Sequence, residues 1–119
     1  MVRGSVSDIL LLAADPPARD LALAVLGNHS VTVTGLSTEA QKLLAAHTYR
    51  LFIATNLGVP VHQALAAIPS DHTYPVLFIS GAWDESIEQT CREKRVRSMQ
   101  APFRLEELQR EIDNALRES

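Results

Sequence analysis

Side chains that could do chemistry follow the apolar runs of this sequence, yet almost none of them is charged. The segment 51–60 reads LFIATNLGVP, and its apolar run ends in Thr55. A later apolar run ends in Ser80, and the first run leads into an acidic residue, Asp15. Mg²⁺ prefers carboxylate oxygens, and a hydroxyl group becomes a good nucleophile only when a base or a metal activates it. One carboxylate and two hydroxyl groups are a sparse set for metal binding or phosphoryl transfer.

Five apolar segments alternate with segments that have helical spacing. The apolar segments, which we expect to form strands, span residues 8–14, 30–35, 50–54, 75–80 and 96–100. Strict alternation of strands and helices predicts an α/β domain whose parallel sheet has helices on both faces. With right-handed crossovers, the common arrangement for five strands is the doubly wound, flavodoxin-like order 2-1-3-4-5. We expect a single domain of this kind over residues 1–119, with five helices.

The helices are predicted from their caps and from the spacing of their apolar side chains. Ser37 and Asp84 are good N-cap residues for the second and fourth helices. Leu21 in the first helix, His47 in the second and Leu105 in the fifth have the spacing of inward-facing positions. We therefore expect these three side chains to pack against the sheet.

The composition excludes several classes of protein. The 119 residues are 46% hydrophobic and 21% charged, with a formal net charge of −3, as in an ordinary globular domain. That charge lacks the basic excess of a nucleic-acid-binding module. A single cysteine, Cys91, excludes an intrachain disulfide and fits a reducing compartment. We identify no membrane-length apolar run and no signal peptide, so we expect a cytoplasmic protein.

In a doubly wound sheet, ligands bind in the crevice at the carboxyl ends of the strands. The residues that end or follow the first, third, fourth and fifth strands would line this crevice: Ala13, Ala14, Asp15, Thr55, Asn56, Ser80, Gly81, Gln100, Ala101 and Pro102. Only Asp15 among them is charged, so the crevice has few groups that could bind or react with a charged ligand.

Four segments, in this order and spacing, resemble the CheY-like receiver domains of bacterial two-component response regulators. ILLLAADPPARDLALAVL is similar to their opening, and YRLFIATNLGVP stands where they have the phosphoacceptor strand. PVLFISGAWDE ends, like their fourth strand, in a hydroxyl residue and a small residue. MQAPFRLEELQREIDNAL is similar to their closing pattern, a Lys-Pro-Phe followed by a Leu-Glu-Glu-Leu helix. The resemblance covers about residues 8–117 and implies the same flavodoxin-like fold.

The resemblance also implies a phosphorylation pocket, and this sequence departs from it. In a receiver domain, an aspartate on the third strand accepts the phosphoryl group, and that position falls on Thr55. Two acidic residues that hold Mg²⁺ fall on Ala13 and Ala14, and the lysine that contacts the phosphoryl oxygens falls on Ala101. Only the hydroxyl position is kept, as Ser80. The resemblance is therefore to a degenerate pseudo-receiver that lacks the phosphoacceptor aspartate.

The three retained polar residues each have a second interpretation. Asp15 is either a residual metal ligand or the N-cap of the first helix, where it precedes Pro16. Thr55 is either a threonine phosphorylated by another route or an ordinary β-branched residue at a strand end. Ser80 is either an anion-binding group or a turn residue. We predict no metal, no cofactor and no catalytic residue.

A candidate partner surface lies near the fourth helix and the fifth strand. It comprises Trp83, Arg92, Arg95 and Arg97, with Lys94 in the same basic run. In receiver domains the fourth helix, fifth strand and fifth helix form a common partner or dimer face, so the resemblance places this surface there. The alternatives are that the tryptophan ring packs over the fourth helix and that the basic residues form a solvated helix face.

These observations lead to one expected function and two alternatives. We expect a pseudo-receiver that acts in signal transduction by phosphorylation-independent protein–protein interaction, and not an enzyme. Its partner is another protein, or a second copy through the fourth helix, fifth strand and fifth helix; we expect no membrane partner and no direct binding of nucleic acid. The alternatives are a regulatory module that binds a small molecule or nucleotide in the crevice, and a regulator phosphorylated in an unconventional way.

Overall fold

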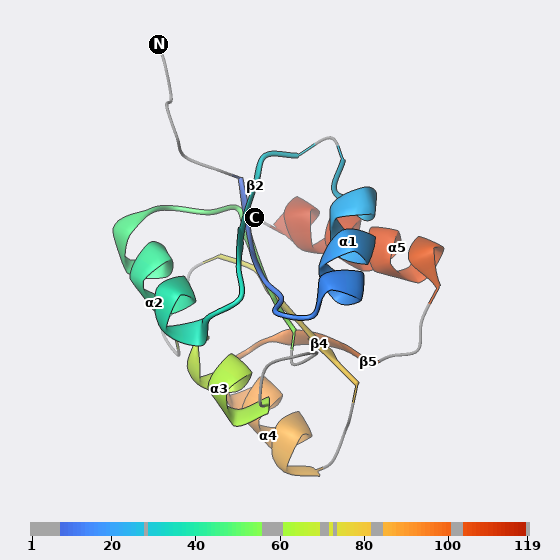
Figure 1. The fold of residues 1–119 in the computed structure, drawn as a ribbon. Helices are drawn as coiled ribbons and strands as arrows, with labels where there is room; N and C mark the ends of the chain where they lie inside the picture. Colours follow the sequence, from blue (N-terminus) through green and yellow to red (C-terminus); the bar gives the residue numbers. More distant parts are fainter. Residues whose placement is uncertain are drawn as a thin grey trace.

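The computed structural model describes residues 8–118 except 28, 56–60, 70–71, 73, 82–84 and 101–103. Five strands alternate with five helices in the described residues (Figure 1). The strands are β1 (Ile9–Leu12), β2 (Val31–Thr34), β3 (Leu51–Thr55), β4 (Val76–Ser80) and β5 (Arg97–Gln100). The helices are α1 (Pro16–Val25), α2 (Ser37–Ala46), α3 (Val61–Ala66), α4 (Glu85–Glu93) and α5 (Leu105–Glu118).

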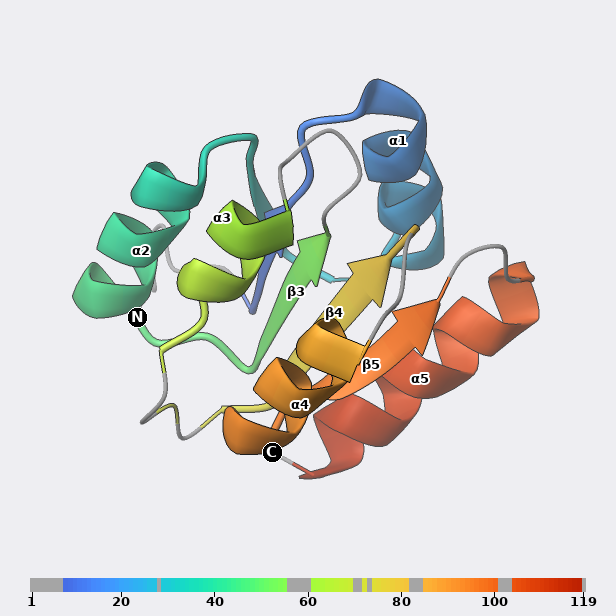
Figure 2. The same cartoon turned by 90° about the horizontal axis from the view of Figure 1, so that it is seen from below.

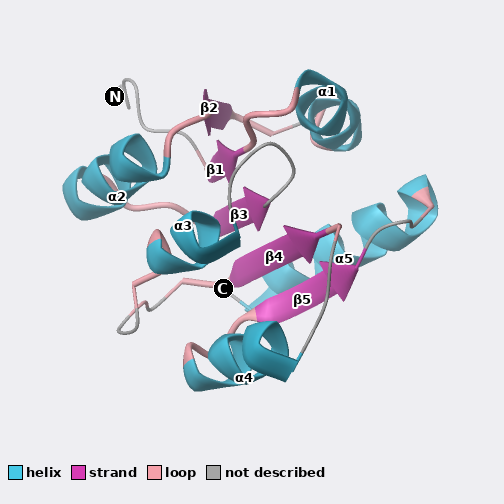
Figure 3. Cartoon of the chain, turned by 60° about the horizontal axis from the view of Figure 1, so that its bottom comes forward, coloured by secondary structure: helices cyan, strands magenta, loops and turns pink. Residues whose placement is uncertain are grey.

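The strands form one parallel sheet in the order β2-β1-β3-β4-β5. This confirms the predicted strand order and the doubly wound, flavodoxin-like fold. The strand order reverses at β1, so the chain builds the sheet outward first in one direction and then in the other. Crossover helices therefore lie on both faces of the sheet: α1 and α5 on one, and α2, α3 and α4 on the other (Figures 2 and 3).

The core consists of two apolar layers, one on each face of the sheet. Every residue of β1, β3 and β4 is buried, which explains why these segments read as continuous apolar runs rather than alternating ones. Their side chains alternate between the layers: Leu10 and Phe52 pack toward α2, α3 and α4, whereas Leu11 and Ile53 pack toward α1 and α5. Burial of each such side chain stabilises the fold by about 1.5–3 kcal/mol.

Three side chains that the helical spacing placed in the core lie at its margin instead. Leu21 is 37% exposed and Leu105 is 49% exposed. His47 follows the last residue of α2 in an extended conformation and is exposed. The buried aromatic residue at this end is Tyr49, whose ring meets that of His47 edge-on at 6.3 Å. The spacing of apolar residues along a helix identifies the side that faces the sheet. It does not show how far the apolar layer between that helix and the sheet extends, so residues at its margin can be exposed.

The start of α2 also differs from the sequence prediction. Ser37 is the first residue of the helix, and the N-cap position is taken by Leu36, which makes no side-chain capping bond. The hydroxyl of Thr34, at the end of β2, accepts a hydrogen bond from the Leu36 amide at 3.2 Å and donates one to the carboxylate of Glu39. A threonine on the preceding strand therefore organises the entry to α2. Asp84, the predicted cap of α4, lies outside the described residues.

Candidate functional site

The register of the parallel strands brings the predicted crevice residues to one edge of the sheet. Leu12 of β1 is opposite Ala54 of β3, so the next residue of each strand lies at the same level. Thr55 is in turn opposite Ile79, the neighbour of Ser80, at the end of β4. The carboxyl ends of the three central strands are thus adjacent, as the fold requires.

Thr55, which the sequence resemblance assigned to the phosphoacceptor position, has a hydroxyl group that forms a hydrogen bond within the protein. The residue is 2% exposed. Its Oγ1 donates a buried hydrogen bond to the main-chain carbonyl of Leu12, at 3.0 Å. This bond joins the ends of β3 and β1.

Ser80 is completely buried, at 0% exposure. Alternation along β4 directs its side chain toward the layer that contains Val76 and Phe78, rather than toward the layer that Ile53 and Thr55 face. Throughout the described part of the chain, every buried side-chain nitrogen and oxygen has a hydrogen-bond partner. Neither Ser80 nor Thr55 is therefore an orphaned polar group that requires a ligand.

The residues after β1 provide little for a metal ion. Ala13 is 3% exposed, and its amide donates to the carbonyl of Thr34 at 2.9 Å, so it continues the pairing with β2. Ala14 is exposed. The main-chain carbonyl of Asp15 accepts from the amide of Arg19 at 2.9 Å, which places Asp15 at the N-cap position of α1. Among the described residues, no group of three or more His, Cys, Asp or Glu side chains could hold a metal ion.

Two of the predicted site residues, Ala101 and Trp83, lie outside the described residues. The three arginines of the candidate partner surface are described, and two of them form ion pairs. Arg92 contacts Glu88 at 2.7 Å on α4, and Arg97 of β5 contacts Glu111 of α5 at 3.3 Å.

The third arginine, Arg95, is exposed and has a positive φ of 56°. It ends α4 in a Schellman motif: the amide of Val96 donates to the carbonyl of Cys91 at 2.8 Å, and the amide of Arg95 donates to that of Arg92 at 3.1 Å. Residues in the left-handed conformation end many helices, and glycine is the usual choice.

Lys94 has a different role from its arginine neighbours, and the sequence pattern did not reveal it. Its Nζ donates to the main-chain carbonyls of Leu65 and Ile68, at 2.8 and 2.7 Å. Burial lowers the pKa of this ammonium group. The carbonyl of Lys94 in turn meets Nε2 of His72 at 2.6 Å, and Nδ1 of the same ring meets the carbonyl of Tyr74 at 2.8 Å. Lys94 therefore connects α4 to the end of α3 instead of extending a surface patch.

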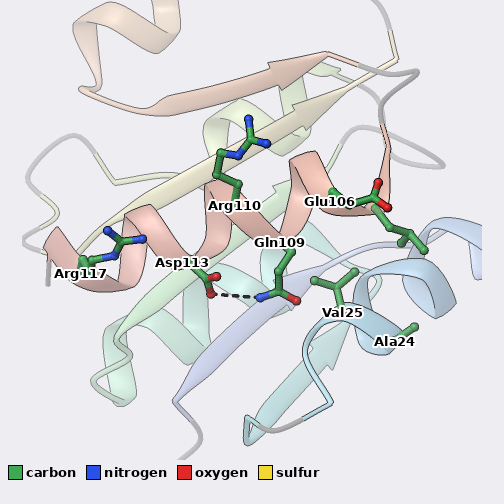
Figure 4. A pocket seen from close by; sticks show the side chains of 8 residues that line it. Ala24, Val25, Glu106, Gln109, Arg110, Asp113 and Arg117 are labelled. Carbon is green, nitrogen blue, oxygen red and sulfur yellow. Dashed lines mark hydrogen bonds between the residues drawn. The ribbon is translucent and has the colours of Figure 1, made fainter.

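Two of the grooves on the described surface lie between neighbouring helices. The first, of about 520 Å³, runs between α1 and α5 and is lined by Ala24, Val25 and six residues of α5 (Figure 4). The second, of about 460 Å³, lies between α2 and α3, and Gln41, Leu44 and Tyr74 are among its lining residues. Neither groove can be predicted from the sequence pattern, because each forms between helices whose packing that pattern does not specify.

The sequence matches no protein-family model and no curated protein. The fold, in contrast, is similar to solved receiver domains. One is a CheY-like response regulator receiver domain from Methanospirillum hungatei JF-1, with a TM-score of 0.79, 13% identity and 96% of each chain covered. Another is the receiver domain of NtrX from Brucella abortus, with a TM-score of 0.78, 21% identity, and 94% of this chain and 100% of that chain covered.

A third similar structure is the signal receiver domain of an HD domain-containing protein from Pseudomonas fluorescens Pf-5, with a TM-score of 0.79 and 19% identity; 95% of this chain and 96% of that chain are covered. The chain therefore has the fold of CheY-like receiver domains, as the resemblance in sequence implied. None of the described helices has the length and apolar character needed to cross a lipid bilayer.

Proposed function

We propose that this chain is a pseudo-receiver: a domain with the receiver fold that takes part in signal transduction by binding a protein partner, without accepting a phosphoryl group. One observation carries the proposal. The residue at the phosphoacceptor position, Thr55, is buried, and its hydroxyl is hydrogen-bonded to the carbonyl of Leu12.

Phosphoryl transfer to a side chain requires an accessible nucleophile and positive charge that stabilises the transferring group. Thr55 meets neither requirement. It is 2% exposed, and the neighbouring strand, β1, is followed by Ala13 and Ala14, which offer no carboxylate for Mg²⁺. The lysine position of receiver domains falls on Ala101 in this sequence. The same burial argues against the alternative of an unconventional phosphorylation at Thr55, because a kinase would first have to break the bond to Leu12.

The proposed partner surface comprises the exposed side of α4 and the free edge of β5. Burial alternates along β5: Arg97 and Met99 are half-buried, whereas Ser98 and Gln100 are exposed. Arg92 of α4 and Arg95, which follows that helix, are also exposed, and Trp83 precedes α4 in the sequence. An unpaired strand edge with arginines nearby offers hydrogen-bond donors and acceptors as well as charge to a partner protein.

The test is to treat the protein with acetyl phosphate or beryllofluoride in the presence of Mg²⁺ and to record its amide NMR spectrum. We expect no specific shifts at Thr55, Ser80 or Ala101, since the hydroxyl of Thr55 is buried and already hydrogen-bonded. A phosphorylatable receiver domain treated in parallel shows that the reagents are active. Specific, saturable shifts at these three positions would contradict the proposal and favour a functional phosphorylation pocket.

A further inference from the structure

The outward side of α5 has a regular arrangement of opposite charges. Glu106, Arg110, Asp113 and Arg117 are all exposed, and their spacing of four, three and four residues places them in one stripe along the helix. The opposite side of the helix is the buried one, formed by Leu108, Ile112 and Ala115. The charged stripe therefore points directly away from the core.

The charges along this stripe alternate in sign, so the stripe read from one end is opposite in charge, position by position, to the stripe read from the other end. If a second copy of α5 lies antiparallel to the first, about a two-fold axis between Glu111 and Ile112, then Glu106 faces Arg117 and Arg110 faces Asp113. Every pair has opposite charges, and the symmetry repeats each pair. A self-complementary surface of this kind is what a two-fold symmetric interface requires.

We propose that the α1–α5 face, meaning the charged stripe together with the groove beside it, binds a second copy of this chain in antiparallel orientation. The inference goes beyond the proposed function, because it concerns self-association and holds whether or not another protein binds α4 and β5. It also differs from the dimer that the sequence resemblance suggested: both use α5, but here α1 takes the place of α4 and β5.

The two arginines of this stripe differ from Arg92 of α4 in their ion pairing within the described chain. On α4, Arg92 is held by Glu88 of the same helix at 2.7 Å. In the described part of the chain, none of the ion pairs involves Arg110 or Arg117. Figure 4 shows both guanidinium groups extending away from Val25, whereas the carboxylate of Asp113 accepts a hydrogen bond from Gln109, at 3.0 Å.

The groove beside the stripe adds apolar surface that a second copy would cover. Its volume is about 520 Å³, and Ala24, Val25 and Leu105 line it. Leu105 is 49% exposed, and Leu21, which precedes Ala24 by one helical turn, is 37% exposed. Two large aliphatic side chains exposed on one face lose contact with water when the face is covered, which favours association.

The expected dimer is weak. A helix of 14 residues is about 21 Å long. Two such helices and the adjoining part of α1 bury less than the about 1,200 Å² of total surface that stable interfaces typically reach. Exposed ion pairs contribute little individually. We therefore expect a dissociation constant between about 1 µM and 1 mM, which weakens as salt screens the pairs.

Sedimentation velocity over a concentration series tests the proposal through a charge swap. Arg110→Glu places a glutamate opposite Asp113 of the other copy, on each side of the axis, and so creates two pairs of negative charges. Asp113→Arg places an arginine opposite Arg110 of the other copy and so creates two pairs of positive charges. We expect each single variant to weaken association at least about tenfold. The double variant R110E/D113R restores opposite charges and should associate within about threefold of the wild type. An equimolar mixture of the two single variants should form a heterodimer more readily than either variant forms a homodimer.

Several outcomes would overturn the proposal. A wild-type protein that stays monomeric up to about 1 mM shows that the face does not self-associate. A double variant that remains as weak as the single ones excludes the antiparallel pairing. Arg92→Glu, on the exposed side of α4, is the matched control; if it weakens association as strongly as Arg110→Glu does, the dimer uses the α4 side instead. If a single variant loses its fold in circular dichroism, the salt dependence of the wild type and the double variant still decide the question.

Discussion

At the scale of single residues, the structure shows that Thr55 has a structural role at a position where a functional one was expected. Its hydroxyl connects β3 to the main chain of β1. A receiver domain would present a carboxylate at this position, with a free oxygen for the incoming phosphoryl group. Here the side chain is shorter and neutral, and it bonds inward.

Thr55→Val tests this role, because valine keeps the shape and removes the hydroxyl. We expect the free energy of unfolding to fall by about 1 kcal/mol, the usual net contribution of one buried hydrogen bond. Urea unfolding monitored by circular dichroism measures the change. Thr38→Val on the exposed side of α2 is the matched control and should change stability by less than about 0.5 kcal/mol. Equal stability of Thr55→Val and wild type would contradict the assigned bond.

At the scale of secondary-structure elements, the end of α4 contains the one unfavourable backbone conformation found in a non-glycine residue of the described chain. Arg95 has a φ of 56°, in the left-handed region. That conformation is less favourable for an L-residue by roughly 1–2 kcal/mol, whereas glycine adopts it without a steric penalty. The Schellman motif requires a residue in this conformation, and its hydrogen bonds satisfy the last carbonyls of the helix. These hydrogen bonds offset the unfavourable φ of the arginine.

Arg95→Gly is therefore expected to stabilise the domain, by about 0.5–1 kcal/mol after the larger conformational entropy of glycine in the unfolded chain is subtracted. The midpoint of guanidinium unfolding should rise with an unchanged slope. Arg95→Val, in which a β-branched residue must adopt the same φ, should lower the midpoint. A lower midpoint for Arg95→Gly would mean that the exposed arginine side chain contributes more than the strain removes.

The sequence predicted the order of the secondary-structure elements but not the placement of several side chains on them. Alternation of apolar runs with helical segments was sufficient for the order of elements and for the sheet, because each β-α unit specifies its own crossover and the fold has few ways to combine five of them. It was not sufficient to predict the exposure of Leu105 and Leu21, since how much of such a side chain is covered depends on how closely the neighbouring helix packs. Nor could it separate Lys94 from Arg92 and Arg95, because the direction of a long side chain at a helix end depends on which carbonyl groups lie nearby.

For the candidate site, the strand order placed Ala13, Ala14 and Thr55 at the carboxyl edge of the sheet. That they stand where receiver domains have phosphotransfer groups is implied only by the resemblance and stays a prediction. The bond from Thr55 to Leu12 could not be predicted, because its acceptor is a main-chain atom that every residue has. The groove between α1 and α5 could not be predicted from the sequence pattern either, because it depends on the distance between two helices.

At the scale of the whole molecule, the rate at which a thiol reagent labels Cys91 measures how often the folded domain opens. Cys91 is the only cysteine, it is 3% exposed, and burial raises the pKa of its thiol. The thiolate is the reactive form, so both effects protect the folded protein. We expect labelling by a thiol reagent at pH 8 to be at least about a hundredfold slower than in urea, and to follow the free energy of opening. Rapid labelling in native buffer would contradict the burial of this side chain.

The sign of the pH dependence follows from the same shift. Below the ordinary thiol pKa of about 8.5, the thiol is neutral in the folded and unfolded chains, so its contribution to stability is fully present. As the pH rises further, the unfolded chain ionises first and stability falls until the folded pKa is reached. Cys91→Ala should remove this component, and the wild type and variant should differ more in their pH dependence above pH 9 than below pH 8.

The contact between Lys94 and the end of α3 has a consequence for how this domain can move. The carbonyls of Leu65 and Ile68 are at the negative end of a short helix, and the cation that neutralises them comes from the next β-α unit. If α4 swings outward, that positive charge leaves and the carbonyls lose their partner together. The third and fourth β-α units are therefore coupled, and an outward movement of α4 carries the cost of leaving these two carbonyls without their cation.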